Sequence, residues 1–320
     1  MTDEAILNAL RRRPGEYVSG EEMSRLIGVS RTAVWKEIQK LREEGYKILA
    51  QPHAGYQLVG TPDRLIPQEL SWNLAADRIG KRIHAYETTD STMDVAHRLA
   101  AAGEPEGSVV VAEGQSQGRG RLGRSWLSPK SKGIYASVIL RPSLRLSEVP
   151  LVTLMAAVAV SRAIQAGTGL SPEIKWPNDV LIRGKKVAGI LTELNAEVDR
   201  VNYIVVGIGM NVNSGETQLP AHATSISEEL GTKVERVKLA RVLLAELDKI
   251  YSEFLNQGSQ AILEAWRGFA QFLGHRVRVM KEDRALEGQA VDVDSSGALL
   301  IRTDTGFVEP VSAGEVVIVR

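Results

Sequence analysis

The sequence feature that most constrains this chain is the run of residues 115–126, Gln-Ser-Gln-Gly-Arg-Gly-Arg-Leu-Gly-Arg-Ser-Trp, which holds three glycines and three arginines. It lies between two strand-like stretches, residues 109–111 and 134–140. Glycine lets the backbone turn through positive φ and approach a ligand, and the planar guanidinium group suits phosphate or carboxylate. A solvated basic turn or an RNA-binding tract would use the same residues. The flanking strands favour an anion-binding loop for a small phosphorylated ligand.

Composition excludes several kinds of site. The 320 residues contain no cysteine, which excludes disulfides, thiolate metal sites and a cysteine nucleophile. The five histidines show no metal-ligand spacing, so no metal site is predicted. Basic and acidic residues both total 39, so net charge does not decide for or against nucleic acid. The apolar run 151–160 is far shorter than the roughly 20 residues that span a bilayer, and no export signal is visible. We therefore expect a cytoplasmic protein with no membrane partner.

The first sixty residues predict a winged helix-turn-helix. Ser19 and Glu22 fit a capping box at the start of the second helix, and a glycine-containing turn leads to the third. The predicted segments are helices at 5–10, at 19–26 and from Ser30 onward, and two wing strands at 46–49 and 55–59.

The third of these helices is the predicted DNA-reading element. Val34, Ile38 and Leu41 form an apolar seam, so the opposite face is free to enter a major groove. The predicted DNA contacts are Thr32, Lys36 and Gln39, with Arg31 and Lys40 near phosphates. Residues 1–64 carry ten basic and nine acidic residues, a weak balance for a DNA binder, so binding is expected to need a dimer. A module used only for packing or dimerisation is the alternative.

The rest of the chain predicts an α+β arrangement. From residue 83, strand-like and helical patterns alternate, which favours a mixed sheet with helices packed on one face. Beyond residue 274, short alternating strands predict a small β-barrel. The expected division is a DNA-binding domain at 1–64, a linker with a short helix (67–75) at 65–82, a central domain at 83–271 and a C-terminal domain at 272–320.

Four motifs in the central domain carry a resemblance. They are 118–123 (Gly-Arg-Gly-Arg-Leu-Gly), 175–179 (Lys-Trp-Pro-Asn-Asp), 186–190 (Lys-Val-Ala-Gly-Ile) and 207–213 (Gly-Ile-Gly-Met-Asn-Val-Asn). In this order they resemble the biotin protein ligase family, and with the winged helix they are similar to its bifunctional members, which also repress transcription. The resemblance implies a class II synthetase-like central domain and an SH3-like C-terminal domain.

The resemblance also implies two half-reactions. Biotin and ATP give biotinyl-5′-AMP and pyrophosphate, and the acyl group then passes to a lysine of the biotin carboxyl carrier domain of acetyl-CoA or pyruvate carboxylase. Activating a carboxylate brings two anions together, so cations must neutralise them. The implied catalytic residues are Arg121 over the ligand carboxylate and phosphate, Lys186 near the acyl carbonyl and α-phosphate, and Asp179 orienting the carrier lysine or helping to bind Mg²⁺. A closed loop would shield the adenylate from water.

Two sets of binding positions follow from the resemblance. The implied biotin-binding residues are Ser91, Thr92, Gln115, Arg119, Gly120, Arg121, Lys186 and Gly189. The implied ATP- and adenylate-binding residues are Arg119, Arg121, Arg124, Trp126, Lys175, Asn178, Lys186 and Asn211. Met93 stands where the best-known member has asparagine. Residues 214–227 contain no tryptophan to cover the adenine, so its cover stays open.

Simpler explanations exist for several of these residues. Ser91 also fits a helix cap, and Asn178 with Asp179 fits a turn after Pro177. Trp126 and Trp176 also fit a hydrophobic core; we favour core for Trp176.

Three other functions share the same sequence features. They are a ligand-sensing repressor without catalysis, a lipoate ligase, and a biotin ligase without DNA binding. The predicted switch is that adenylate, when no carrier awaits biotin, orders loops and favours a homodimer on a two-half-site operator.

Overall fold

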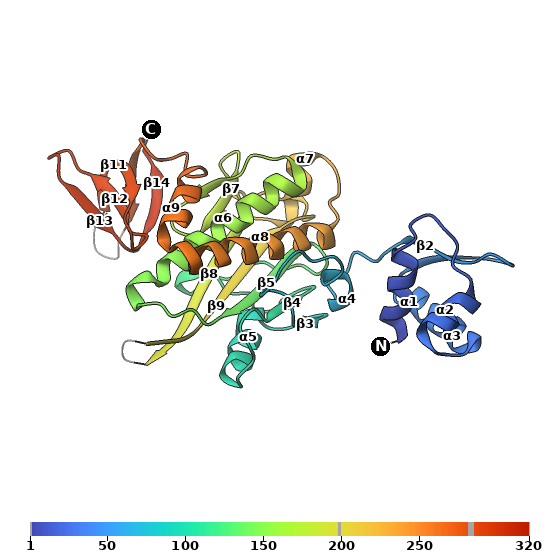
Figure 1. Cartoon of the computed structure of the whole chain (residues 1–320). Coiled ribbons are helices and arrows are strands. Elements are labelled where there is room, and N and C mark those ends of the chain that lie inside the picture. Colours follow the sequence, from blue (N-terminus) through green and yellow to red (C-terminus); the bar gives the residue numbers. More distant parts are fainter. Residues whose placement is uncertain (1, 198–199, 281–284, 320) are drawn as a thin grey trace. The chain divides into compact units, whose positions relative to one another are not determined.

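A computed structural model of the chain describes residues 2–197, 200–280 and 285–319. It separates into two compact units, Met1–Asp63 and Arg64–Arg320 (Figure 1). Each unit contains its own cluster of buried hydrophobic residues. The two units are therefore described one at a time.

The first unit has the predicted three helices and two-stranded wing. Ser19 Oγ accepts from the Glu22 amide and Ser30 Oγ accepts from the Ala33 amide, so both expected helix caps are formed. Gly28 ends the second helix with φ at 74°, a left-handed conformation that favours glycine. The elements are α1 (Thr2–Arg11), α2 (Gly20–Ile27), α3 (Arg31–Glu43), β1 (Lys47–Gln51) and β2 (Gly55–Gly60). The predicted winged helix-turn-helix is confirmed.

The second unit is built on a seven-stranded mixed sheet. Its strand order is β3 (Ile83–Tyr86), β4 (Val109–Ala112), β5 (Gly133–Leu140), β9 (Arg200–Asn211), β8 (Lys185–Glu197), β7 (Asp179–Ile182) and β6 (Glu173–Lys175). Strands β3 and β4 are parallel and the other neighbours are antiparallel. The predicted mixed sheet is confirmed.

Helices cover both faces of this sheet. Three of them, α6 (Val149–Thr168), α8 (Arg236–Gln257) and α9 (Ser259–Arg267), lie on one face, as predicted (Figure 1). The fourth, α5 (Thr92–Ala101), packs on the opposite face with Val110 and Val205, which corrects the expectation of a single covered face. Alternation along the strands explains this, because successive side chains point to opposite faces. The face beside α5 carries the candidate site.

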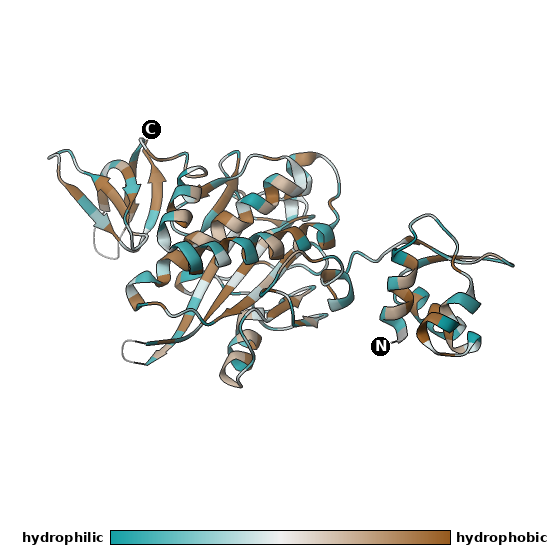
Figure 2. Cartoon of the chain, viewed as in Figure 1, coloured by the Kyte–Doolittle hydropathy of each residue, from teal (hydrophilic) through white to brown (hydrophobic). Residues whose placement is uncertain are grey.

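Helix α6 forms the centre of the core. The helical stretch Leu146–Thr168 is 23 residues long and its most apolar 18-residue window has a mean hydropathy of 1.6, so by length and composition it could cross a membrane. However, 72% of its most apolar window is buried inside the protein. Figure 2 shows hydrophobic residues along α6 and the central strands. The apolar run 151–160 lies within this helix, which is a core element.

The linker helix is shorter than predicted. This helix, α4, spans Pro67–Leu70, whereas the predicted helix spanned residues 67–75. Asn73 has φ at 51°, a left-handed value that a continuing helix does not allow. Another short helix, α7 (Ile226–Leu230), precedes α8.

The C-terminal residues form the expected small all-β part. Its five antiparallel strands have the order β13 (Val308–Val311), β12 (Leu299–Arg302), β11 (Ala285–Val293), β10 (Arg276–Met280) and β14 (Glu315–Ile318). Val277 and Val279 belong to the same buried cluster as the central sheet. Trp176, which is buried as predicted, donates from Nε1 to the carbonyl oxygen of Gly297 at 3.1 Å. These contacts join the C-terminal sheet to the central domain.

Candidate functional site

The site begins with a patch of sheet that carries no side chains. On β9, Ile208 points into the large core, so Gly207 and Gly209 face the opposite side, next to Gly189 of β8. A Cβ at Gly209 would lie 2.4 Å from the Trp126 indole, and one at Gly207 would lie 2.5 Å from Met93 Sδ. Gly189, Gly207 and Gly209 therefore form a bare surface, the glycine floor, which flat groups can approach closely.

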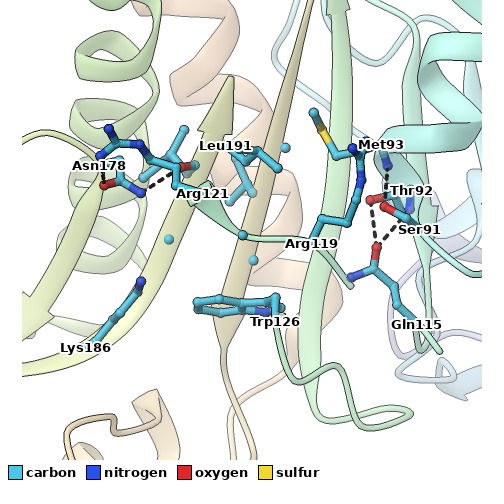
Figure 3. Close-up of a pocket in the computed structure, with 16 residues that line it drawn as sticks. Ser91, Thr92, Met93, Gln115, Arg119, Arg121, Trp126, Asn178, Lys186 and Leu191 are labelled. Carbon is cyan, nitrogen blue, oxygen red and sulfur yellow. Dashed lines mark hydrogen bonds between the residues drawn. The ribbon is translucent and has the colours of Figure 1, made fainter. Parts of the chain in front are cut away.

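Two adjoining pockets share one wall of residues. The first has an empty volume of about 450 Å³ and is lined at one end by Ser91, Thr92, Met93 and Gln115 (Figure 3). The second has about 820 Å³ and extends to Asn211, Leu219, Pro220, His222 and Glu315. The residues that line both are Gly120, Arg121, Trp126, Asn178 and Lys186. We call this shared set the junction.

A hydrogen-bonded group of polar side chains closes the far end of the first pocket. Gln115 Oε1 accepts from the Thr92 amide at 2.8 Å and from its hydroxyl at 3.1 Å, while Gln115 Nε2 donates to Ser128 Oγ at 2.8 Å. Ser91 Oγ accepts from the Met93 amide at 3.3 Å, so Ser91 caps α5 and also lines the pocket. These fixed groups suit an uncharged polar ligand head.

The junction holds two cations, and the carboxylate of Asp179 in the second pocket lies beside it. Lys186 Nζ lies 2.7 Å from Asp179 Oδ1 and 5.3 Å from the centre of the Trp126 ring. Arg121 Nη1 donates to Asn178 Oδ1 at 3.0 Å, and burial lowers the pKa of its guanidinium group although nearby Asp179 opposes this. Asn178 Nδ2 donates across to the carbonyl of Ile190 at 3.0 Å. Fixed cations between two pockets can neutralise anions that arrive from both sides.

The loop that carries the arginines is folded over the floor. The Trp126 amide donates to the Gly118 carbonyl at 2.8 Å, and the Gly120 amide donates to the Arg124 carbonyl. Among the three loop glycines, Gly123 has positive φ, at 71°, whereas Gly118 is needed because a Cβ there would lie 2.4 Å from the Trp126 carbonyl oxygen. Gly118 is therefore explained by the close approach of the Trp126 backbone, and Gly123 by its left-handed conformation.

The other predicted ligand residues are distributed unevenly. Arg119 lines the first pocket but is paired with Glu193 and Asp94. Arg124 pairs with Glu315 on β14, and this hydrogen bond lowers the pKa of Glu315. The structure brings one predicted residue to neither pocket: Lys175 lines a separate hollow with Phe272 and Ile318. It contributes only at a distance, by also lowering the pKa of Glu315.

Sequence reasoning missed one wall of the second pocket. Residues 219–223 lie against Lys186, whose amide donates to the His222 carbonyl at 2.9 Å. Asn211, which also lines this pocket, donates from Nδ2 to the carbonyl of Thr224, directly after this segment, at 3.1 Å. This segment has no periodic pattern, so its position could not be predicted from the sequence.

The first unit has a hollow between α3 and the wing. Arg31, Thr32 and Trp35 of α3 line it together with His53 of the wing. Lys36 is exposed as predicted, Gln39 is half-buried, and Lys40 lies 3.3 Å from Glu37 and farther from two more carboxylates. Trp35, which the sequence reasoning passed over, is 52% exposed.

Comparison with known families defines the class of protein. Residues 85–211 match the profile of the Biotin/lipoate A/B protein ligase family, residues 3–57 match an HTH domain, and residues 272–319 match the Biotin protein ligase C terminal domain. The matched regions and the fold are thus those of a ligase of this class that also carries a helix-turn-helix unit and a C-terminal domain.

Similarity to individual proteins identifies the family within this class. The chain is 40% identical over 96% of both chains to the Bifunctional ligase/repressor BirA of Bacillus spizizenii, and 29% identical to that of Escherichia coli over 94% of this chain and 93% of that one. A biotin protein ligase from Aquifex aeolicus, solved with biotin and ATP, matches with a TM-score of 0.64 and 31% identity over 75% of this chain and 99% of that one. The chain belongs to the biotin protein ligase family.

Proposed function

We propose that this chain joins biotin to AMP, using ATP, and then transfers biotin to a lysine of a carrier protein. The observation that carries this proposal is the position of Arg121 and Lys186 in the wall shared by two pockets. A carboxylate from one pocket and an α-phosphate from the other meet at these cations, which offset the repulsion between them. The ligands named for the Aquifex aeolicus relative, biotin and ATP, support this assignment.

Biotin occupies the first pocket in this proposal. Its ureido ring contacts the polar group of Ser91, Thr92 and Gln115, and its apolar tail crosses the glycine floor toward the junction. Adenosine occupies the second pocket, between Trp126 and residues 219–223.

Mg²⁺ enters with the phosphates of ATP. Two carboxylates, Asp179 and Glu315, line the second pocket, and each is already paired with a cation. Such a small protein contribution fits an ion that takes most of its ligands from phosphate and water. When bound, the ion supplies positive charge to the leaving pyrophosphate, and Asp179 is the side chain that would hold it.

The second half-reaction uses the same junction. The amine of a carrier lysine must lose a proton to attack the acyl carbon, and Asp179 is the carboxylate at this place. The partner is the biotin carboxyl carrier domain of acetyl-CoA or pyruvate carboxylase.

The first unit acts as a biotin-responsive repressor in the cytoplasm. Arg31, Thr32 and Lys36 are exposed on the first turns of α3, where a helix-turn-helix contacts bases and phosphates. Operator DNA is bound by a homodimer that forms when adenylate fills the site and no carrier removes it. Gel shifts with the DNA upstream of biotin genes, with and without biotin and ATP, test this role; equal shifts in both conditions would contradict it.

Exchange of labelled pyrophosphate into ATP tests the first half-reaction. We expect exchange that depends on biotin and that lipoate does not support. Lys186→Ala should slow it by about 10²-fold to 10³-fold, as expected for loss of a charge that stabilises the transition state. Lys185→Ala is the matched control, because the neighbouring Lys185 is exposed and lines neither pocket. No exchange in the wild type, or equal rates in both variants, would contradict the proposal.

A further inference from the structure

Arg119 is engaged by two carboxylates. Its Nη1 and Nη2 atoms donate to Oε1 and Oε2 of Glu193, both at 3.0 Å, and Nη2 also lies 2.9 Å from Asp94 Oδ1. The pair with Glu193 is bidentate, which is the strong and directional form of this contact. Arg119 comes from the ligand loop, Glu193 from β8 and Asp94 from α5. Three separate elements therefore meet at one guanidinium group.

The charge of this cluster is unsuited to receiving an anion. Arg119 contributes one positive charge, while Asp94 and Glu193 contribute one negative charge each, so the formal sum is −1 when the adjacent His97 is neutral. A biotin carboxylate or a phosphate would have to displace a carboxylate to reach Arg119. By contrast, Arg121 donates to the neutral amide of Asn178 and points toward the junction.

Glu193 is itself held in place from the other side. His97 Nε2 lies 2.9 Å from Glu193 Oε2, and the His97 ring packs 5.7 Å from the ring of Tyr203. Asp94 and His97 lie one turn apart on α5, the helix whose first residues line the first pocket. In Figure 3, Arg119 extends toward Met93, away from Arg121 and Lys186.

Fixing the side chain of Arg119 also fixes the loop. The backbone of Arg119 forms an isolated antiparallel β-bridge with the backbone of Ser125. The Trp126 amide donates to the Gly118 carbonyl. The segment from 118 to 126 is thus a small closed unit, and its Arg119 side chain ties it to β8 and α5. The same unit places Trp126 on the glycine floor.

We propose that Glu193 is a positioning residue that, with Asp94, holds Arg119 as a strap keeping the ligand loop closed. Arg119 then retains ligand by anchoring the loop, and Arg121 and Lys186 neutralise the reacting anions. This inference rests on the proposed function, because the retained ligand is biotinyl-5′-AMP.

A double-mutant cycle with preformed biotinyl-5′-AMP tests the strap. The full-length wild type, Arg119→Ala, Glu193→Ala and the double variant are loaded with the adenylate, and its release is followed after a chase. We expect each single variant to release adenylate about 10-fold faster, as for loss of a charge-assisted pair, and the double variant to release it no faster than the faster single variant. Glu197→Ala, which removes an exposed carboxylate from the same strand, is the control and should match the wild type.

Three results would overturn the strap. In the first, Glu193→Ala releases adenylate at the wild-type rate while Arg119→Ala accelerates release. In the second, the two effects multiply in the double variant, which indicates that Arg119 contacts the ligand directly. In the third, Glu193→Ala lowers the maximal rate of pyrophosphate exchange as strongly as it affects release, which would place Glu193 in the chemical step.

Hydrogen exchange of the ligand-free chain separates this inference from the proposed function. The amides of Gly120 and Trp126 are protected by hydrogen bonds within the loop. We expect them to exchange about 10-fold faster in Glu193→Ala than in the wild type or Glu197→Ala, because the loop opens locally more often. Unchanged exchange would exclude the strap even if the chain proved to bind no adenylate.

Discussion

At the scale of single residues, identical side chains in one loop have different partners. Arg119 is paired with two carboxylates, Arg121 with an amide, and Arg124 with Glu315 of the C-terminal sheet. An arginine that is paired with a carboxylate has its charge neutralised and is less available to an anionic ligand. Because these partners lie far away in sequence, three similar arginines give no indication of which one faces the reaction.

Asp179 gives a prediction at this scale. In Asp179→Asn the carboxylate beside Lys186 is replaced by a neutral amide of the same size, so Lys186 keeps its charge but the carrier lysine loses its proton acceptor. We expect transfer from adenylate to a carrier domain to slow by about 10-fold to 100-fold. Pyrophosphate exchange should be much less affected, because Mg²⁺ would keep its phosphate and water ligands when Asp179 loses its charge. Both rates are measured on the same preparation. Equal losses in the two half-reactions would remove Asp179 from the transfer step.

The sequence indicated which candidate site residues lie together better than it indicated their geometry. Arg121, Lys186, Asn178 and Asp179 come together because the turn from β6 to β7 and the start of β8 meet under the loop. Motif order indicated that they share a site. Motif order did not predict that Lys175, although it is close in sequence to Asn178, lines a separate hollow and neither of the two pockets.

At the scale of elements, alternation along β9 separates the core from the site. Its apolar residues at 204, 206, 208 and 210 belong to the large core, and its glycines at 207 and 209 let Met93 and Trp126 approach the other face closely. Periodic segments such as α6 and the winged helix were predictable because apolar spacing determines them. The ends of the hairpin β8–β9 were not, because Asn195 and Glu197 are polar, exposed strand residues without a hydrophobic pattern.

The glycine floor gives a prediction at this scale. In Gly209→Ala the new methyl group would lie 2.4 Å from the Trp126 indole, which must then move into the space of the ligand. We expect the affinity for biotinyl-5′-AMP to fall by about 10-fold or more, or ~1.4 kcal/mol, measured by calorimetry. Gly215→Ala is the control, since open space surrounds that position. Wild-type affinity in Gly209→Ala would show that the floor is not used.

At the scale of the whole molecule, the division at residue 63 separates two cores but leaves the linker attached to the ligase. Leu65, which is 1% exposed, donates from its amide to Glu113 Oε1 at 2.6 Å. Glu113 in turn forms a buried ion pair with Arg236 at 2.9 Å and accepts from Ser131 Oγ at 3.1 Å. The turn-forming residues 60–63 predict that the DNA-binding domain ends at residue 64 and that a linker follows at 65–82.

Two truncated chains test this reading of the boundary. A fragment of residues 64–320 keeps Leu65 and should form adenylate without binding DNA. A fragment of residues 67–320 loses the Leu65 side chain and its amide, so we expect its free energy of unfolding to be lower by ~3 kcal/mol, measured by urea denaturation. Equal stability of the two fragments would show that Leu65 contributes nothing to the ligase unit.

The central claim is that the junction joins two ligands that approach from opposite sides. A crystal structure of the full chain with biotinyl-5′-AMP tests it most directly. We expect the biotin rings beside Thr92 and Gln115, the phosphate at Arg121 and Lys186, and the adenine beside residues 219–223, under a closed loop. An adenylate bound elsewhere, or bound here with Arg121 and Lys186 turned away from its phosphate, would contradict it.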